Sequence, residues 1–335
     1  MNKKWNVSFA RLAAIALLGG LTSITSASLR SEELPHITVN VFPGGFNWPS
    51  FVALDKGFFE RNGIRVTLQF TPNSVAQMTG LAEGKFDIAI TAVDNIVAYV
   101  EGQGEAPIGP QPDFFAFMGG DSGFLNLVVA PYVKSFRDLN GQTLSVDART
   151  TGYAFVLFEM LARNGLHEGD YSIEKVGGTV QRWNALRDKK PYQGNVGATR
   201  RSWAMENKTV VIAFIRAYVQ TIDWLYDKSN REEAVRILQE NVPEMSPGLA
   251  GQSYAELLDP QGGFSPTGRV DLEGLRTVLA LRSRYAEPPR TLTDPLKYYD
   301  PSYYDLAMRT SGSRATSRGH SLPQKASGTS TKTHP

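Results

Sequence analysis

Short β-branched runs alternate with helical segments over residues 37–164 of this 335-residue chain, and this order limits the possible folds more than any other feature. Neighbouring parallel strands need a crossover connection, which is usually a helix. The pattern therefore predicts an α/β protein with a largely parallel sheet. The expected strands are residues 37–42, 64–70, 86–91, 114–118, 125–130 and 143–146, and the expected helices are residues 50–61, 74–83 and 153–164.

The later part of the chain is predicted to be mainly helical. Apolar residues at helical spacing indicate helices at residues 210–226, 231–241 and 272–285. The first of these carries Arg216 and Asp223 at mid-length, so we expect it to pack inside a protein rather than span a membrane. Pro and Gly residues at 243–268 predict a long irregular link.

Both ends of the chain carry positive charge, and neither resembles part of a fold. Residues 1–27 hold three basic residues, no acidic residue and an apolar run at 12–21 that is too short to span a bilayer. This pattern predicts a secretory signal cleaved near Ala27 and a periplasmic protein; the alternative is an amphipathic or buried helix. Residues 309–335 hold five basic residues and one large aliphatic residue, Leu322, so we expect a disordered tail.

The two ends also explain the net charge. The whole chain has a formal charge of +2, and without the ends (+3 and +5) residues 28–308 carry −6. Basic tails can bind nucleic acid or anionic lipid, but a solvated extension without a role is the simpler interpretation here. We therefore expect no nucleic-acid partner.

The sequence contains no cysteine. This excludes disulfides, zinc–thiolate sites, iron–sulfur clusters, cysteine nucleophiles and cysteine-linked lipid anchors. Within residues 28–308 only His36 and His167 are histidines, and no metal-ligand cluster, phosphate loop or dinucleotide motif is present. We therefore expect no metal, no cofactor and no catalytic residues.

Ligands of parallel α/β sheets bind where strands end and loops meet helix N-termini. The loop after the first expected strand contains Phe46, Asn47 and Trp48, whose rings suit an apolar or π-faced ligand and whose amide can orient it. The alternative is a tight turn whose aromatic side chains fill the core. Asp94 and Asn95 follow the third strand, where they are expected to cap a helix, to line the same site, or to do both.

A later loop, which contains Thr150, Thr151, Gly152 and Tyr153, leads into a helix. Either threonine can cap that helix, and the exposed N–H groups and the helix dipole predict an anion site, to which Arg149 would add charge. Many helices begin this way without binding a ligand, so a purely structural cap is the alternative.

The sequence Gly120-Asp121-Ser122-Gly123 is similar to the nucleophile loop of trypsin-like proteases. Phe124 stands where those enzymes have glycine, and no histidine lies in a suitable context, so a Ser–His–Asp triad is not expected. Ser122 and the backbone N–H groups of this loop remain candidates for hydrogen bonds to a ligand.

Three further stretches occur together in a known family. They read KGFFERNGI at residues 56–64, GLAEGKFDIAI at 80–90 and FRDLNGQTLSVDARTTGYAFVLFEMLARNGL at 136–166. They resemble the substrate-binding proteins of ABC importers, in the group of nitrate, sulfonate, taurine and pyrimidine-precursor binders. The resemblance covers roughly residues 35–305. It implies the type II periplasmic-binding fold, an α/β fold with two lobes, parallel-rich sheets flanked by helices and a helical C-terminal part.

The resemblance also implies how the parts work. Residues 28–125 would form the first lobe, 126–205 the second, and 206–308 a return to the first. A monomer would close by a hinge on a small molecule and deliver it to an ABC permease in the membrane. The ligand contacts would fall on the loops already selected, at Phe46, Asn47, Trp48, Asp94, Asn95, Ser122, Thr150, Thr151, Gly152 and Tyr153.

One segment departs from the family pattern. After residue 187 the family continues with a strand, a ligand loop and a helix, whereas here residues 188–191 lead directly into Tyr192. A strand and a helix of the second lobe, about 30–40 residues by the usual lengths of such a unit, are therefore expected to be missing.

The leading hypothesis is an exported, non-enzymatic binding protein for an anionic or heteroaromatic small molecule. One alternative is an enzyme on the same scaffold, either of the pyrimidine-precursor type or a hydrolase that uses Ser122. The related enzyme branch relies on cysteines, which this chain lacks. Another alternative is a truncated copy without function.

Overall fold

The computed structural model describes residues 33–123, 127, 129, 132–146, 148–175, 194–260 and 262–315. The chain divides into Met1–Glu33 and Leu34–Pro335, and all the secondary structure described below lies in the second unit. The expected signal at 1–27 and the expected deletion at 188–191 lie outside the described residues, as does most of the expected strand at 125–130.

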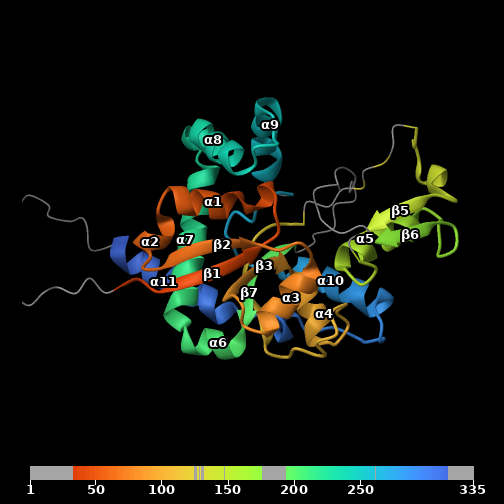
Figure 1. Cartoon of the computed structure of the whole chain (residues 1–335), viewed down its shortest axis with the longest axis horizontal. Helices are drawn as coiled ribbons and strands as arrows, with labels where there is room; N and C mark the ends of the chain where they lie inside the picture. The colour runs from red at the N-terminus through yellow and green to blue at the C-terminus, as the bar shows by residue number, and fades with distance from the viewer. Residues whose placement is uncertain are drawn as a thin grey trace, which may run out of the picture. The chain divides into compact units, whose positions relative to one another are not determined.

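A five-stranded sheet forms the centre of this unit (Figure 1). Its order is β2-β1-β3-β7-β4; β1 pairs in parallel with β2 and β3, and β7 pairs antiparallel with β3 and β4. The expected α/β class with a parallel-rich sheet is therefore confirmed. The strands are β1 (His36–Val41), β2 (Arg65–Phe70), β3 (Ile88–Ala92), β4 (Phe114–Gly119) and β7 (Asn195–Arg200).

The described residues also form helices, several of which pack on this sheet. They are α1 (Trp48–Asp55), α2 (Phe58–Arg61), α3 (Ser74–Ala82), α4 (Val93–Val100), α5 (Gly152–Arg163), α6 (Arg201–Glu206), α7 (Lys208–Tyr226), α8 (Arg231–Asn241), α9 (Pro247–Leu257), α10 (Leu272–Tyr285) and α11 (Pro301–Ala315). Short 3-10 turns within the described residues are η1 (Gly45–Asn47), η2 (Phe136–Leu139), η4 (Lys228–Asn230) and η5 (Pro295–Lys297). Polar side chains mark several helix starts: Asn73 accepts a hydrogen bond from the Ala76 N–H at 2.8 Å, and Asp271 accepts one from the Glu273 N–H at 3.0 Å. Such caps satisfy N–H groups that have no partner inside the helix.

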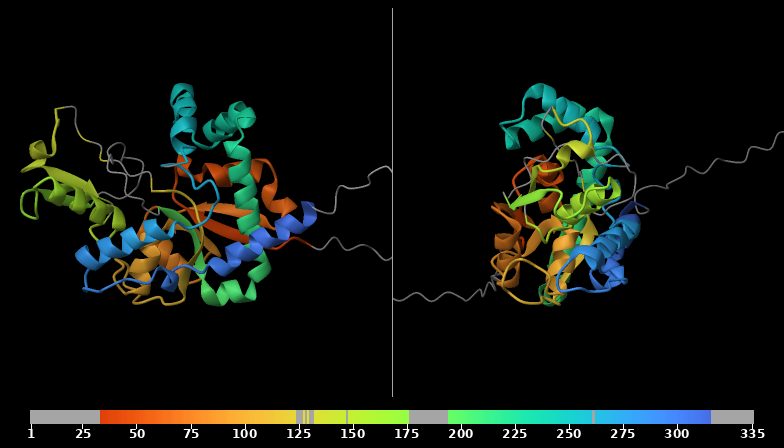
Figure 2. Two further views of the ribbon diagram at one scale, coloured as in Figure 1. Left: turned by 180° about the vertical axis from the view of Figure 1, so that it is seen from behind. Right: turned by 90° about the vertical axis from the view of Figure 1, so that its right-hand side faces the viewer.

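Alternate residues of the strands face two separate cores. In β4, Phe115 and Phe117 pack into a core with α1, α7 and α11, whereas Phe114 and Ala116 pack into a core with α4 and α10. This follows from the strand geometry, because successive side chains point to opposite faces of a sheet. Figure 2 shows α7 and α11 crossing the back of the sheet, on the side away from α3 and α4.

A smaller β-α-β unit lies between β4 and β7 in the chain. The strands β5 (Thr143–Val146) and β6 (Ser172–Lys175) pair in parallel, and α5 connects them. Leu144, Val146, Leu157 and Leu161 belong to a small apolar core of this unit. β7 follows it in the chain and pairs within the five-stranded sheet, although the sequence-based division placed residues 195–200 in the second lobe.

Three expectations about helices are wrong. The expected helix at 50–61 is broken, because Gly57 adopts a left-handed φ of 63° between α1 and α2. The stretch at 243–268 is not irregular throughout, since α9 begins at Pro247 directly after the capping residue Ser246. The tail expected to be disordered from residue 309 begins as helix, because α11 continues to Ala315.

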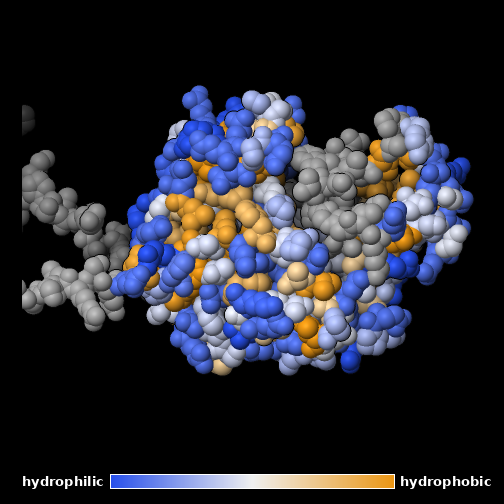
Figure 3. Space-filling model, in the orientation of Figure 1, coloured by the Kyte–Doolittle hydropathy of each residue, from blue (hydrophilic) through white to orange (hydrophobic). Residues whose placement is uncertain are grey.

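The surface is mixed in character. In Figure 3 hydrophilic residues cover most of α8 and α9 and the β5–β6 unit, and apolar residues gather over α1 and β2. Phe70, at the end of the edge strand β2, is 54% exposed. Within the part of the chain that the structure describes, none of the helices has the length and apolar character needed to cross a membrane.

Substitution of Phe117 by alanine is expected to lower the free energy of unfolding by about 3–5 kcal/mol, because this ring is fully buried and packs edge-on against Phe214. The same substitution at the exposed Phe70 is the matched control and is expected to change it by less than about 1 kcal/mol. Urea unfolding of both variants measures the difference, and equal effects would contradict the assignment of the core.

Candidate functional site

The loop after β1 is built into the core. Trp48 is fully buried, its indole N–H donates to the Ala234 carbonyl at 2.9 Å, and its ring meets the edge of Tyr254 with centroids 5.9 Å apart. Asn47 is also buried, and its amide donates to the carbonyls of Phe42 and Gly44. Neither side chain offers surface to a ligand in this arrangement; of the three loop residues only Phe46 is partly exposed.

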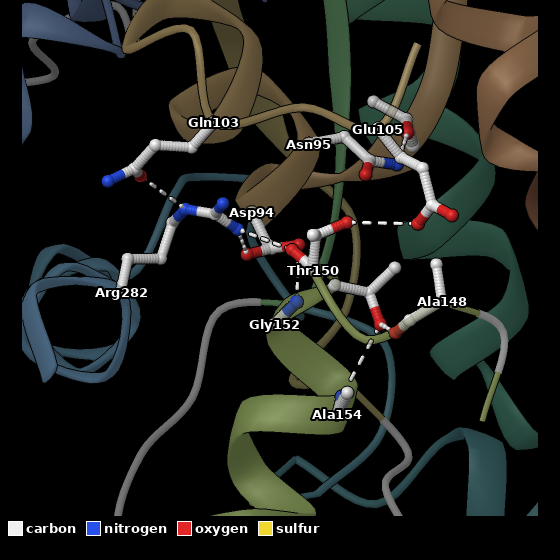
Figure 4. A network of polar contacts seen from close by, with 11 residues as sticks. Asp94, Asn95, Gln103, Glu105, Ala148, Thr150, Gly152, Ala154 and Arg282 are labelled. Carbon is white, nitrogen blue, oxygen red and sulfur yellow. Dashed lines mark hydrogen bonds and ion pairs between the residues drawn. The ribbon is translucent and has the colours of Figure 1, made fainter. Parts of the chain in front are cut away.

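Asp94 is the centre of a buried polar network (Figure 4). It lies in the first turn of α4, directly after β3. One carboxylate oxygen, Oδ1, pairs with Nη1 of Arg282 at 2.5 Å, and the other, Oδ2, accepts a hydrogen bond from the Gly152 N–H at 2.5 Å. Asp94 therefore joins α4 to the first residue of α5 and to α10.

Arg282 completes this network from α10 and is fully buried. Its Nε donates to Oε1 of Gln103 at 3.2 Å, its Nη1 also donates to the Thr150 carbonyl at 3.2 Å, and its guanidinium lies 5.0 Å from the centre of the Phe155 ring. Its Nη2 is buried and has no hydrogen-bond partner among the described residues. A charge in this position needs its partners, because an isolated buried charge is strongly unfavourable.

The N-terminus of α5 is closed by groups of the protein itself. The Gly152 N–H donates to Asp94, and the Ala154 N–H donates to Oγ1 of the capping residue Thr151 at 3.4 Å. The hydroxyl of Thr151 also donates to the Ala148 carbonyl at 3.0 Å. The sequence predicted an anion site here, and the anion found at this helix start is a carboxylate of the chain.

The groups on the exposed side of this network are paired as well. Thr150 Oγ1 donates to Oε2 of Glu105 at 3.1 Å, and Arg149 pairs with Glu168 at 2.9 Å. The sequence interpretation expected Arg149 to add positive charge to an anion site, whereas in the structure this residue is paired with an acidic side chain. Asn95, also buried, donates to Oγ1 of Thr91 at 2.9 Å.

α5 is held against α10 by more than this ion pair. Phe155 stacks on Tyr285 with ring centroids 6.0 Å apart. Glu159 accepts hydrogen bonds from Arg284 at 2.7 Å and from the Tyr285 hydroxyl at 2.8 Å. Burial together with the hydrogen bond to Glu159 raises the pKa of Tyr285 to about 12, so this hydroxyl remains a donor at neutral pH.

The linking segments, which are residues 120–122 after β4 and residues 194–195 at the start of β7, lie side by side. The Gly194 N–H donates to the Asp121 carbonyl at 3.0 Å, and the Gly120 N–H donates to the Asn195 carbonyl at 2.8 Å. The Asp121 carboxylate accepts from the backbone N–H of Asn195 at 3.0 Å and from its side-chain amide at 2.6 Å. Burial raises the pKa of the Asp121 carboxyl, although the hydrogen bonds from Asn195 and Gly123 oppose this effect.

Ser122 is next to this crossing and is only partly exposed. Its backbone N–H donates to the Gly263 carbonyl at 3.2 Å, and its hydroxyl donates to the same oxygen at 3.3 Å. A carbonyl cannot take a proton from this hydroxyl, so the contact does not activate a nucleophile. Among the described residues, no group of three or more His, Asp or Glu side chains could hold a metal ion.

Three polar residues of the site were missed by the sequence interpretation: Gln103, Asn195 and Arg282. A signal for Arg282 was present, because it continues the apolar spacing of Leu275, Val278 and Leu279 along one face of α10. A charged residue inside an apolar helical stripe indicates a buried ion pair or hydrogen-bond network.

Comparisons with known proteins agree with this architecture. Residues 47–190 match the sequence family described as "NMT1/THI5 like". The fold is similar to that of a protein from Bordetella bronchiseptica RB50, at 18% identity and a TM-score of 0.68, with 84% of this chain and 100% of that chain covered. No curated protein matches the sequence.

Two further solved structures with this fold are named for what they bind. The nitrate-binding protein NrtA from Synechocystis PCC 6803 is 14% identical with a TM-score of 0.63, and 83% of this chain and 89% of that chain are covered. The alkanesulfonate-binding protein SsuA from Xanthomonas axonopodis pv. citri, solved with bound MOPS, is 13% identical with a TM-score of 0.61, and the coverage is 80% and 99%. The chain therefore has the type II periplasmic-binding-protein fold, as the sequence resemblance implied.

Substitution of Gly194 by alanine is expected to lower the free energy of unfolding by about 2–3 kcal/mol, because the added Cβ would lie 2.1 Å from Oδ1 of Asp121 and 2.3 Å from Gly123. Thermal unfolding and urea unfolding measure this loss.

Gly251→Ala is the matched control for this substitution. Gly251 lies inside α9, a Cβ there meets nothing within 4 Å, and alanine is expected to stabilise the helix by about 0.5–1 kcal/mol. If Gly194→Ala is as stable as wild type, the two linking segments are not packed as tightly as described.

Proposed function

We propose that this chain is an exported solute-binding protein that captures a small molecule and delivers it to an ABC permease. The observation that carries the proposal is the meeting of α4, α5 and the two linking segments at the ends of β3 and β4. This is the edge of an α/β sheet at which ligands bind in proteins of this architecture. The fold shared with nitrate-binding and alkanesulfonate-binding proteins supports it.

We assign direct ligand contacts to the partly exposed members of the expected set, Phe46, Ser122, Thr150 and Tyr153. The buried members (Asn47, Trp48, Asp94, Asn95, Thr151 and Gly152) then hold these loops in position. The proposed ligand is a small organic molecule bound between the two lobes, and hinge closure on it by a monomer would present the protein to the permease.

We propose a binding function rather than an enzymatic one. A hydrolase would need a base beside Ser122, and the contact that its hydroxyl makes is with the Gly263 carbonyl. The absence of cysteine separates the chain from the pyrimidine-precursor enzymes that it resembles.

Binding is tested with the full chain and a panel of nitrate, alkanesulfonates, aromatic carboxylates, pyrimidines, amides and amines, read by melting temperature. At least one compound is expected to raise the melting temperature in a saturable way, because a ligand that binds only the folded state stabilises it. A folded sample that responds to no compound would contradict the proposal.

For the compound that binds, Thr150→Ala is expected to weaken the affinity about five- to tenfold, which is the usual effect of losing one hydrogen bond. Thr277→Ala is the matched control, because this threonine donates only to the Glu273 carbonyl of its own helix. Isothermal titration of the two variants measures the difference, and equal affinities would remove Thr150 from the site.

Export is proposed from the signal pattern at residues 1–27. Expression of the full chain in a Gram-negative host is expected to yield a periplasmic protein whose N-terminal residue is Ser28, as measured by mass spectrometry of the intact protein. Lys3→Glu/Lys4→Glu should reduce the exported fraction, since the signal depends on its positive start. An uncleaved protein retained in the cytoplasm would contradict export.

A further inference from the structure

We infer that Asp94 occupies the anion position at the start of α5, so that this site selects an uncharged or cationic ligand and rejects an acidic one. The inference rests on the proposed solute binding and narrows its ligand class. The sequence predicted that Asp94 contacts the ligand, whereas this inference makes Asp94 an internal anion that replaces one supplied by the ligand.

The contacts of Asp94 are those that a bound anion would make. Its two carboxylate oxygens take different partners, the Arg282 guanidinium and the Gly152 N–H. It also lies in the first turn of α4, so the positive ends of two helix dipoles, of α4 and α5, act on the same carboxylate. Helix N-termini and a guanidinium are the elements of which anion sites are made.

The carboxylate is sequestered together with its counter-charge. The side chain of Asp94 is 2% exposed and that of Arg282 is not exposed at all. The pair is neutral as a whole, and Thr150 and Gln103 bind the guanidinium further. The described residues of this network therefore leave no net positive charge for an acidic ligand.

A ligand anion at the start of α5 would have to displace Asp94 or lie close to it. The neutral ion pair offers such an anion no net attraction, because Asp94 already holds the guanidinium and the N–H group that the anion would bind. Displacement would leave the Asp94 carboxylate buried without Arg282, which is also strongly unfavourable.

The charged residues beside this network also disfavour an acidic ligand. Arg149, the basic residue beside Thr150 in the chain, pairs with Glu168. Glu105 accepts the hydrogen bond of the Thr150 hydroxyl. These contacts offer a carboxylate or sulfonate no unpaired cation among the described residues, which favours a ligand without an acidic group.

The test removes the internal anion and supplies one from solution. Full-length Asp94→Ala should melt about 5–10 °C below wild type, because Arg282 and the Gly152 N–H lose their partner. Sodium formate at constant ionic strength should recover at least half of that loss in a saturable way, since it can bind Nη1, the unpartnered Nη2 and the Gly152 N–H. Wild type should not respond to formate, nitrate or methanesulfonate.

Two variants control the rescue. Asp138→Ala removes another aspartate that accepts hydrogen bonds from backbone N–H groups, those of Lys134 and Ser135. Asp138 has no arginine partner among the described ion pairs, so formate should not raise the melting temperature of this variant. Asp94→Ala/Arg282→Met removes both charges and should also be insensitive to formate. If Asp94→Ala is recovered only unfolded, it is replaced by Asp94→Ser, which also vacates the carboxylate position. Its melting temperature should rise with formate while that of wild type does not.

Two results would overturn the inference. One is a saturable response of wild type to formate, nitrate or methanesulfonate that equals the response of Asp94→Ala. The other is a folded Asp94→Ala that no formate concentration stabilises. The two proposals fail separately. If formate rescues Asp94→Ala but no compound of the ligand panel binds wild type, Asp94 is supported as the occupant of the anion position and solute binding is contradicted.

Discussion

The buried ion pair between Asp94 and Arg282 is the interaction on which the arrangement of the site depends. Neither charge can be buried alone without a large loss of stability, so α4 and α10 must come together for both. The same two side chains bind the N–H of Gly152 and the carbonyl of Thr150, which determines where the first turn of α5 lies. One pair therefore couples three segments that are far apart in the sequence.

A second constraint comes from the paired linking segments. Asp121 and Asn195 hold these segments together through backbone and side-chain hydrogen bonds, and Gly194 permits an approach that a Cβ would prevent. The chain thus leaves β4 and enters β7 through two adjacent segments, and α5 is bound separately to α10 by Phe155 and Glu159. A movement of the small unit relative to the large sheet would have to break both sets of contacts.

Much of the fold was predictable because its elements have strong local signals. The helices α8 and α10 and the strand β5 have the bounds that apolar spacing and strand propensity predict. The division of the helix at 50–61 was missed because Gly57 adopts a left-handed conformation that the apolar pattern does not encode. The candidate loops were found by the rule that ligands bind at strand ends, but the rule could not tell that Trp48 and Asn47 would be buried.

By itself the sequence determined the alternation of strands and helices, the class of fold and the loops that meet at one edge of the sheet, because these follow from local periodicity and turn chemistry. Only the tertiary structure decided that the anion at the start of α5 is Asp94 and that its partner is Arg282. The reason is physical: these residues are 188 positions apart in the chain, and a buried ion pair forms only after helix packing has brought its members together.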